Sequence, residues 1–234
     1  MTDQSVIYFD GEGTMSNAPA TAPVSPSRAR KRKVRGRAEK SSARREAIIA
    51  AALDEFSARG FAATRIDDVA RRAGVAKGTI YLYFRDKEAL FQEIVRTMLV
   101  PIVGVLEAPP PGDIPVRKLL EAFIDLFVRE VYSTKRRAVL RLVMTEGPRF
   151  PKLAEFHYRN VVERAMAAMR ALIERAIARG ELKHDALLRF PQLVVAPGIV
   201  AIIWTGLFDR FAPLDVTALM RAQLEILFGK EGAS

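Results

Sequence analysis

The segment covering residues 61–90 restricts the fold more than any other part of this chain. Its first half carries four apolar residues at the spacing of one helix face. Gly74 follows them directly, and glycine readily adopts the left-handed backbone that ends a helix. Ile80 then supplies an apolar side chain that can hold a second short helix against the first. The spacing therefore predicts two short helices joined by a tight turn. The apolar residues of the first helix are Ile66, Val69, Ala70 and Ala73.

A helix pair of this kind can present its second helix to the major groove of DNA. Because Ile80 faces the first helix, the other faces of the second helix are open to DNA. Tyr81 and Tyr83 can contact phosphate or a thymine methyl group, or can pack within the domain instead. The centre of the helix has no Arg or Asn, so no familiar bidentate pairing shows which bases are read. The residues available to DNA are Lys77, Gly78, Thr79, Tyr81 and Tyr83.

The segment resembles the N-terminal domain of the TetR family of transcriptional regulators. The resemblance is strong over about residues 40–95. The rest of the chain resembles the family only in its length and in its helical sequence pattern. It implies an all-α fold, with a three-helix DNA-binding head containing a helix-turn-helix and then a larger helical ligand-binding and dimerisation domain. The matching residues, in order and without gaps, are Gly60-Phe61, Thr64, Ile66, Val69-Ala70, Ala73-Gly74-Val75, Lys77-Gly78-Thr79, Tyr81, Tyr83-Phe84 and Lys87-Glu88-Ala89-Leu90.

The resemblance also implies which residues contact DNA. Free N–H groups at helix N-termini favour phosphate, to which a nearby hydroxyl or ammonium group can add a contact. Arg65 stands where the family often has a small hydroxyl residue, and it is either a further phosphate contact or simply solvated. The family's DNA-contacting positions fall here on Thr64, Lys77, Gly78, Thr79, Tyr81, Tyr83 and Lys87.

Positive charge is concentrated before the helix-turn-helix. The net charge is +10, and residues 28–45 hold ten basic residues and one acid, whereas residues 46–90 hold seven of each. Residues 1–40 lack an apolar period, so we expect a disordered tail with a basic arm. Arg35 and Arg37 in this arm are expected to bind phosphates or enter a minor groove. The alternatives are a solubilising tail or a localisation signal.

The remaining pattern is helical throughout and predicts no sheet. A first helix should begin at Ser41 or Ser42 and end at Gly60, and another should run from Asp86 to Pro101 or slightly beyond. Residues 108–113 read as a loop because of their Pro and Gly content. We therefore expect a tail (1–40), a helix-turn-helix domain (41–87) and a ligand-binding and dimerisation domain (88–234). The further predicted helices are 115–132, 135–146, 151–179, 185–208 and 214–228.

Residues 190–208 form a nineteen-residue run without charge. This length raises the possibility of a membrane helix, but Pro191 and the Pro197-Gly198 pair favour a helix buried between the domain core and a partner subunit. The resemblance implies that the last two long helices pair with their copies. A homodimer would read an inverted repeat in double-stranded DNA, with half-sites about 34 Å apart.

The resemblance further implies a ligand pocket inside the helical bundle. Bulky and adaptable apolar side chains suit such a pocket, although any one of them can equally be ordinary core. Arg141 and His157 are the polar residues expected to face inward, and Arg141 would suit an anionic or carbonyl-bearing effector. The expected ligand-binding residues are Phe91, Met98, Phe123, Phe127, Arg141, Met144, Phe156, His157, Met166 and Met169.

Composition argues against several other classes of protein. The chain has no cysteine, which excludes disulfides and cysteine-based zinc sites, and we expect no metal or cofactor. No nucleophile with a base, paired acids or phosphate-cradling loop indicates an enzyme. No signal peptide is evident at the N-terminus, so a cytoplasmic location is expected. What the resemblance implies instead is a repressor released from DNA by a small apolar or anionic effector. The alternative is a constitutive DNA-binding protein whose C-terminal domain only dimerises.

Overall fold

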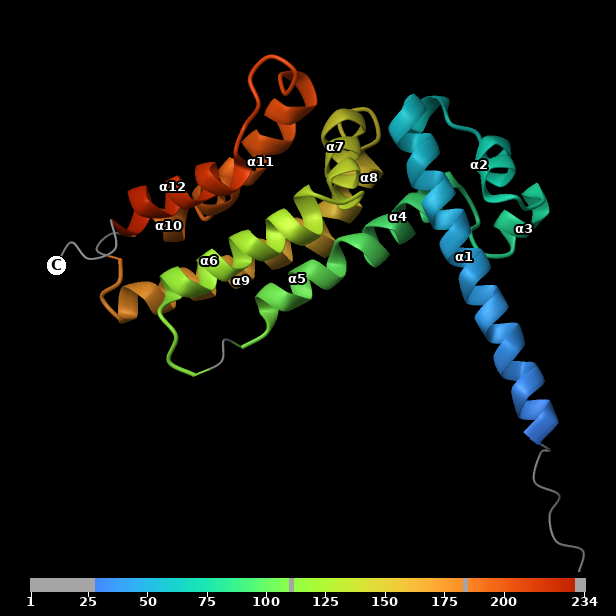
Figure 1. Cartoon of the computed structure of the whole chain (residues 1–234), viewed down its shortest axis with the longest axis horizontal. Coiled ribbons are helices and arrows are strands. Elements are labelled where there is room, and N and C mark those ends of the chain that lie inside the picture. The colour runs from blue at the N-terminus through green and yellow to red at the C-terminus, as the bar shows by residue number, and fades with distance from the viewer. Residues whose placement is uncertain (1–27, 110–111, 183–184, 230–234) are drawn as a thin grey trace, which may run out of the picture. The chain divides into compact units, whose positions relative to one another are not determined.

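The computed structural model describes residues 28–109, 112–182 and 185–229, and every element within these ranges is helical. The chain divides into two compact units, Met1–Ala43 and Arg44–Ser234, and each is described by itself. Of the first unit, the described part is the beginning of one helix. The second unit holds all the other elements (Figure 1).

Helix α1 (Arg28–Ala63) begins well before the predicted start at Ser41 or Ser42. The expectation of disorder is therefore wrong for residues 28–40, while residues 1–27 lie outside the described residues. Arg, Lys and Ala dominate this stretch and are among the best helix formers, so a high charge here coexists with helix. The helix is interrupted at Gly60, whose φ of 79° and ψ of 161° are not helical. The predicted end at Gly60 is thus confirmed.

The helix-turn-helix forms as predicted. Helix α2 (Ile66–Ala73) ends at Gly74, which has the left-handed values φ 65° and ψ 33°. Helix α3 (Lys77–Tyr81) follows, and then α4 (Lys87–Met98). Asp86 caps α4, because its carboxylate accepts a hydrogen bond from the Ala89 amide at 2.6 Å.

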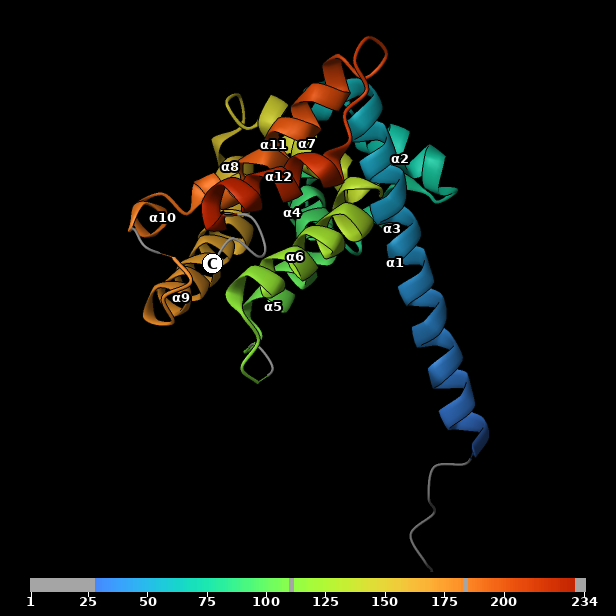
Figure 2. The same cartoon turned by 60° about the vertical axis from the view of Figure 1, so that its left-hand side comes forward.

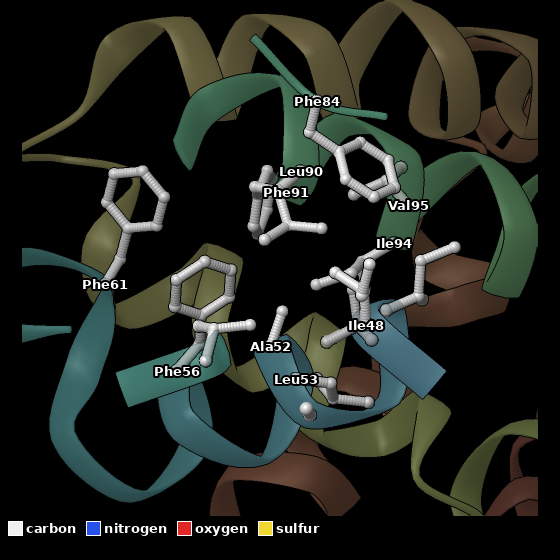
Figure 3. Packing of buried hydrophobic residues seen from close by; sticks show 14 of the residues in the cluster. Ile48, Ala52, Leu53, Phe56, Phe61, Phe84, Leu90, Phe91, Ile94 and Val95 are labelled. Atoms are coloured by element: carbon white, nitrogen blue, oxygen red, sulfur yellow. The ribbon is translucent and has the colours of Figure 1, made fainter. Parts of the chain in front are cut away.

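The core of the head is built around aromatic side chains from α1 and α4 (Figure 3). The Phe61 and Phe91 rings meet nearly edge to face, with centroids 6.0 Å apart. Helices α7 (Arg136–Glu146) and α8 (Pro151–His157) contribute to the same core. The head is therefore not packed independently of the C-terminal half. The buried contributions from α7 and α8 are Val139, Leu142 and Leu153.

The C-terminal half contains the predicted helices with some additional breaks (Figure 2). Helix α5 is separated from α4 at Leu99, and the predicted helix 185–208 is divided into α10 and α11 around Pro191. Proline lacks the N–H needed to continue a helix, which explains the second break. The elements are α5 (Val100–Glu107), α6 (Val116–Leu126), the π-helical η1 (Phe127–Tyr132) and η2 (Tyr158–Val162), α9 (Glu163–Ala178), α10 (Ala186–Arg189), α11 (Gln192–Leu207) and α12 (Val216–Phe228).

A second core lies within this half and joins α6, α9, α11 and α12. Its fully buried centre includes Leu120, Met169 and Ile173. Residues 87–107, covering α4 and α5, are long and apolar enough by composition to cross a membrane. However, Phe91 and other residues of α4 lie in the head core, so this segment is a core helix of the fold. Helix α11 is shorter than the roughly 20 residues that a spanning helix needs.

Candidate DNA-binding surface and ligand cavities

Helix α3 presents most of its predicted DNA-contacting residues at the surface. Ile80 is fully buried and anchors the helix, as predicted. Lys77, Gly78 and Tyr81 are exposed, whereas Thr79 is half-buried. Tyr83 is partly buried against the head core, so packing accounts for part of its side chain. The two tyrosines, whose roles could not be distinguished in the sequence, therefore differ in burial: Tyr81 is exposed and Tyr83 is partly buried.

Lys77 already has a partner on α2. Its ammonium group donates a hydrogen bond to Asp67 Oδ2 at 2.9 Å, and this bond raises the pKa of Lys77. Both side chains are about half exposed, so water screens the pair. A phosphate contact by Lys77 requires exchange of this partner for a phosphate oxygen.

Leu82 was not predicted from the sequence and is the most exposed large apolar side chain beside α3, at 83%. It follows the buried Ile80 by two residues, which places it on the opposite side of the helical turn. The spacing from Ile80 could have identified Leu82 in the sequence. An apolar residue on the side of the helix opposite the buried Ile80 cannot pack in the head core and is therefore exposed. An apolar side chain on this surface suits contact with a thymine methyl group.

Thr64 does not face solvent, which corrects the prediction of a phosphate contact. Its side chain is buried, and its hydroxyl lies 2.8 Å from the Gly60 carbonyl oxygen and 3.1 Å from that of Glu55. The hydroxyl proton is therefore used inside the head. Thr64 thus bonds two carbonyl groups near the end of α1, where a helix leaves its last carbonyl groups without intrahelical partners.

Lys87 is also occupied within the head, so its predicted phosphate contact needs correction. Its ammonium nitrogen lies 2.5, 3.2 and 3.1 Å from the carbonyl oxygens of Phe61, Ala62 and Thr64. It also lies 4.4 Å from the centroid of the Phe61 ring. Burial lowers the pKa of Lys87. Its three donors cap the chain after Gly60 and are not directed at DNA.

The other predicted DNA contacts remain predictions. Arg65 is exposed and has an extended backbone immediately before α2, where its guanidinium is open to phosphate. Arg35 and Arg37 lie within the helical backbone of α1, but their side chains fall outside what the structure describes.

An apolar cavity of about 520 Å³ lies between α5, α6 and α9. Phe123, one of the predicted ligand-binding residues, lines it, and Arg129 is the charged residue in its wall. The cavity size falls within the roughly 300–1,000 Å³ typical of small-molecule sites. Its lining residues are Val105, Leu106, Ala108, Pro109, Ile114, Leu119, Ala122, Phe123, Leu126, Arg129 and Leu172.

Five predicted ligand-binding residues belong to the two cores: the full burial of Phe91 and Met169 corrects their assignment, whereas the ligand contacts of the partly buried Met98, Phe127 and Phe156 stay predictions. Phe91 is fully buried in the head core, and Met98 and Phe156 pack against it. Met169 is fully buried in the second core, against which Phe127 packs. Helical spacing identified their buried faces but not which core would receive them. Met144 and Met166 are half-buried, and their ligand contacts stay predictions.

The two polar residues predicted to face inward differ in their surroundings. His157 is buried, its Nδ1 has no hydrogen-bond partner among the described residues, and burial lowers its pKa to about 4. Arg141 is exposed and lines another cavity, of about 420 Å³, between α7 and α11. Arg141 and Phe123 therefore do not share one pocket.

Helix α11 is buried along one face and exposed along another. Val194, Ala201 and Ile202 face the second core or its neighbours. The exposed face is an apolar stripe, which is densest from Ile199 to Leu207, with Leu207 62% exposed. In the single chain a large apolar surface therefore remains, and its burial against a partner subunit stays a prediction. The α11 stripe consists of Leu193, Ile199, Val200, Ile203, Trp204 and Leu207.

Two family models match most of the described chain. The model of bacterial regulatory proteins of the tetR family matches residues 48–94, which include α2, α3 and most of α4. The model of the tetracyclin repressor-like C-terminal domain matches residues 111–222. The two matches thus cover both the head and the larger helical domain.

Curated relatives agree with these models. The HTH-type transcriptional regulator SrpR of Pseudomonas putida is 25% identical over 166 residues, which make up 71% of this chain and 76% of SrpR. The HTH-type transcriptional regulator AcrR of Shigella flexneri is 35% identical over 103 residues, or 42% of this chain and 47% of AcrR.

Solved structures share the fold across most of the chain. The SmeT–triclosan complex has a TM-score of 0.69 and 22% identity, and the match covers 81% of this chain and 93% of SmeT. FadR of Bacillus subtilis in complex with stearoyl-CoA has a TM-score of 0.64 and 22% identity. The match covers 79% of this chain and 98% of FadR. The helix-turn-helix geometry, both family models and these relatives together show that the chain belongs to the TetR family of DNA-binding transcriptional regulators, and is not an enzyme.

Proposed function

We propose that this regulator is a cytoplasmic homodimeric repressor, which binds an inverted repeat and leaves it when a small molecule binds. The exposed surface of α3, the second helix of the helix-turn-helix, carries the DNA-binding part of the proposal. Lys77, Gly78, Thr79 and Tyr81 are the residues we assign to DNA contact, with Leu82 added for thymine methyl groups.

The dimer is supported by the α11 stripe. An exposed apolar surface of this size on a helix marks a site of association, because water contact with it is unfavourable. Helix α3 has five residues and can read only a few base pairs. Two heads related by a two-fold axis double the recognised sequence and require half-sites about 34 Å apart.

Ligand response is supported by the cavity between α5, α6 and α9. Its mostly apolar wall suits a ligand with a substantial apolar part. Helix α5 follows α4 after a single residue, and α4 carries Phe91 into the head core. A ligand that favours one position of α5 can therefore change the position of the head. A coupling of about 1–3 kcal/mol is enough for such regulation.

The test begins with DNA fragments recovered on the full-length protein. Their sequences should contain an inverted repeat, and a binding assay on that repeat should show release by at least one apolar metabolite or drug. Arg129→Ala, at the cavity wall, should change the concentration needed for release but not operator affinity without ligand. Unchanged affinity with every compound would support the constitutive alternative. Failure to recover any shared DNA sequence would contradict the proposal at its first step.

A further inference from the structure

The cavity between α7 and α11 differs chemically from the apolar cavity. It measures about 420 Å³ and is walled by the segment before α7, one face of α7, and three residues of α11. Three of its nine lining residues are basic and none is acidic. In Figures 1 and 2, α7 and α11 lie side by side. The lining residues are Ser133, Thr134, Lys135, Arg137, Ala138, Arg141, Ile202, Thr205 and Gly206.

The three cations are not equally available to a ligand. Lys135 binds Asp54 at 2.7 Å, so its charge is already paired. Arg137 has its guanidinium carbon over the Tyr132 ring, 4.9 Å from the centroid, a contact that does not pair its charge with an acid. Arg141 passes close to Gly206, where an added Cβ would lie 3.8 Å from its Cδ. Arg137 and Arg141 are one helical turn apart on α7, so both guanidinium groups border the same space.

The hydroxyl groups of the cavity are mostly committed elsewhere. Thr134 donates to the Glu130 carbonyl at 2.6 Å, and Thr205 donates to that of Ala201 at 2.7 Å. A ligand therefore meets guanidinium donors, together with the positive end of the α7 dipole. This set of donors suits carboxylate or phosphate groups, to which arginine can make paired charge-assisted hydrogen bonds.

We propose that the α7–α11 cavity is a second ligand site, specific for small organic anions that carry carboxylate or phosphate groups and held by Arg137 and Arg141. Its volume exceeds what a single inorganic ion fills, so the ligand carries more than one anionic group or an attached organic part. The site is separate from the apolar cavity and is not required for ligand response there.

The position of Arg141 connects this site to the head. Arg141 also lines a smaller cavity of about 210 Å³, whose opposite wall includes Phe56, Ser57 and Gly60 of α1. Helix α7 is bound to the head at both ends, by Lys135 to Asp54 and by Glu146 to the Phe61 amide. An anion that draws Arg141 toward α11 acts on the helix that holds the head. This regulatory consequence rests on the proposed function, whereas anion binding itself does not.

The test is calorimetric titration of the full chain, without DNA, at constant ionic strength. Citrate and pyrophosphate are the carboxylate and phosphate probes, and glucose is the uncharged control. We expect at least one anion to bind with one site per chain. Loss of one guanidinium partner removes charge-assisted bonds, so Arg141→Gln and Arg137→Gln should each weaken binding roughly tenfold or more. Arg170→Gln, at an exposed position on α9, should leave it unchanged.

A second variant keeps the test decisive if Arg141→Gln unfolds. Gly206→Glu places a carboxylate against Arg141 while both arginines remain, and it should abolish anion binding. Equal affinity in the wild type and these variants would place the anions on another basic surface and overturn the proposal, as would no binding of either anion. Operator binding measured without anion tests the proposed function separately. Failure of anion binding and failure of the proposed function can therefore be distinguished.

Discussion

The Phe61 amide donates a hydrogen bond to Glu146 Oε1 across 3.2 Å, and this bond joins the end of α1 to the end of α7. The neighbouring Gly60 makes the approach possible, because a Cβ there would lie 2.5 Å from the same oxygen. Glu146 Oε2 is buried without a hydrogen-bond partner among the described residues. The head and the C-terminal domain therefore share a polar contact as well as a hydrophobic core.

Gly60→Ala should destabilise the protein by about 2 kcal/mol, because a residue with a Cβ pays a penalty at positive φ and also displaces Glu146. Urea unfolding measures the loss. Gly104→Ala in α5 is the matched control, since no atom lies within 4 Å of the added Cβ and its φ is not positive. That change should be neutral or slightly stabilising. Equal effects at the two glycines would show that the close approach to Glu146 carries no energy.

Lys87→Met should lower the free energy of unfolding by about 1–2 kcal/mol, because three carbonyl oxygens lose their donor. The salt dependence of operator binding should keep its slope, since Lys87 is not directed at phosphate. In contrast, Arg65→Gln should reduce the slope by roughly 0.9 if its guanidinium binds one phosphate. A reduced slope in Lys87→Met itself would restore the phosphate role and contradict the capping role.

The head could be predicted closely from the sequence because its signals are local. Gly60, Gly74 and Asp86 each define a helix boundary through their own backbone preference or side chain, without help from distant residues. The roles of Thr64 and Lys87 could not be predicted in this way. A hydroxyl or ammonium group near a helix start looks the same in sequence whether it meets a phosphate or a carbonyl of another turn.

The ligand-binding residues were less predictable for a related reason. Apolar spacing shows that Phe91 and Met169 are buried, but the choice between two cores and a cavity depends on how whole helices pack. The early start of α1, in contrast, could have been predicted from local helix preference. Composition alone indicated disorder, whereas most residues at 28–40, which are Arg, Lys, Ala and Glu, individually favour helix.

Protonation of His157 should destabilise the fold as the pH falls. Burial lowers its pKa from 6.5 to about 4, so between these values the unfolded chain binds the additional proton. The contribution is fully present above pH 6.5, declines below it and is lost by about pH 4, with a total on the order of 3 kcal/mol. His157→Leu should therefore lose less stability than the wild type between pH 7 and 4 in urea titrations. Parallel pH profiles for the two proteins would exclude His157 as the responsible group.

Leu82→Ala should change which operators are bound without changing the salt dependence, because the side chain is apolar and 83% exposed. Selection of random DNA with both proteins measures the preference at each position. We expect the preference for thymine to fall at one position of each half-site, with a loss of about 1 kcal/mol or more. Stability should not change, since Leu82 is outside the head core. A uniform loss of affinity over all sequences would assign Leu82 to general contact and not to base reading.

Leu207→Glu should convert the dimer to a monomer, because it places a charge in the α11 stripe, where Leu207 is 62% exposed in the single chain. A charge buried at an interface without a partner is strongly unfavourable, while in the monomer the same glutamate remains in water. Sedimentation should therefore show a halved mass with unchanged helical content by circular dichroism. Tyr158→Glu, at a residue of similar exposure in η2, is the control and should stay dimeric. Operator affinity should fall when the dimer is lost, because one head contacts only one half-site. If Leu207→Glu remains dimeric and binds the operator normally, the α11 stripe is not the surface that pairs the two heads.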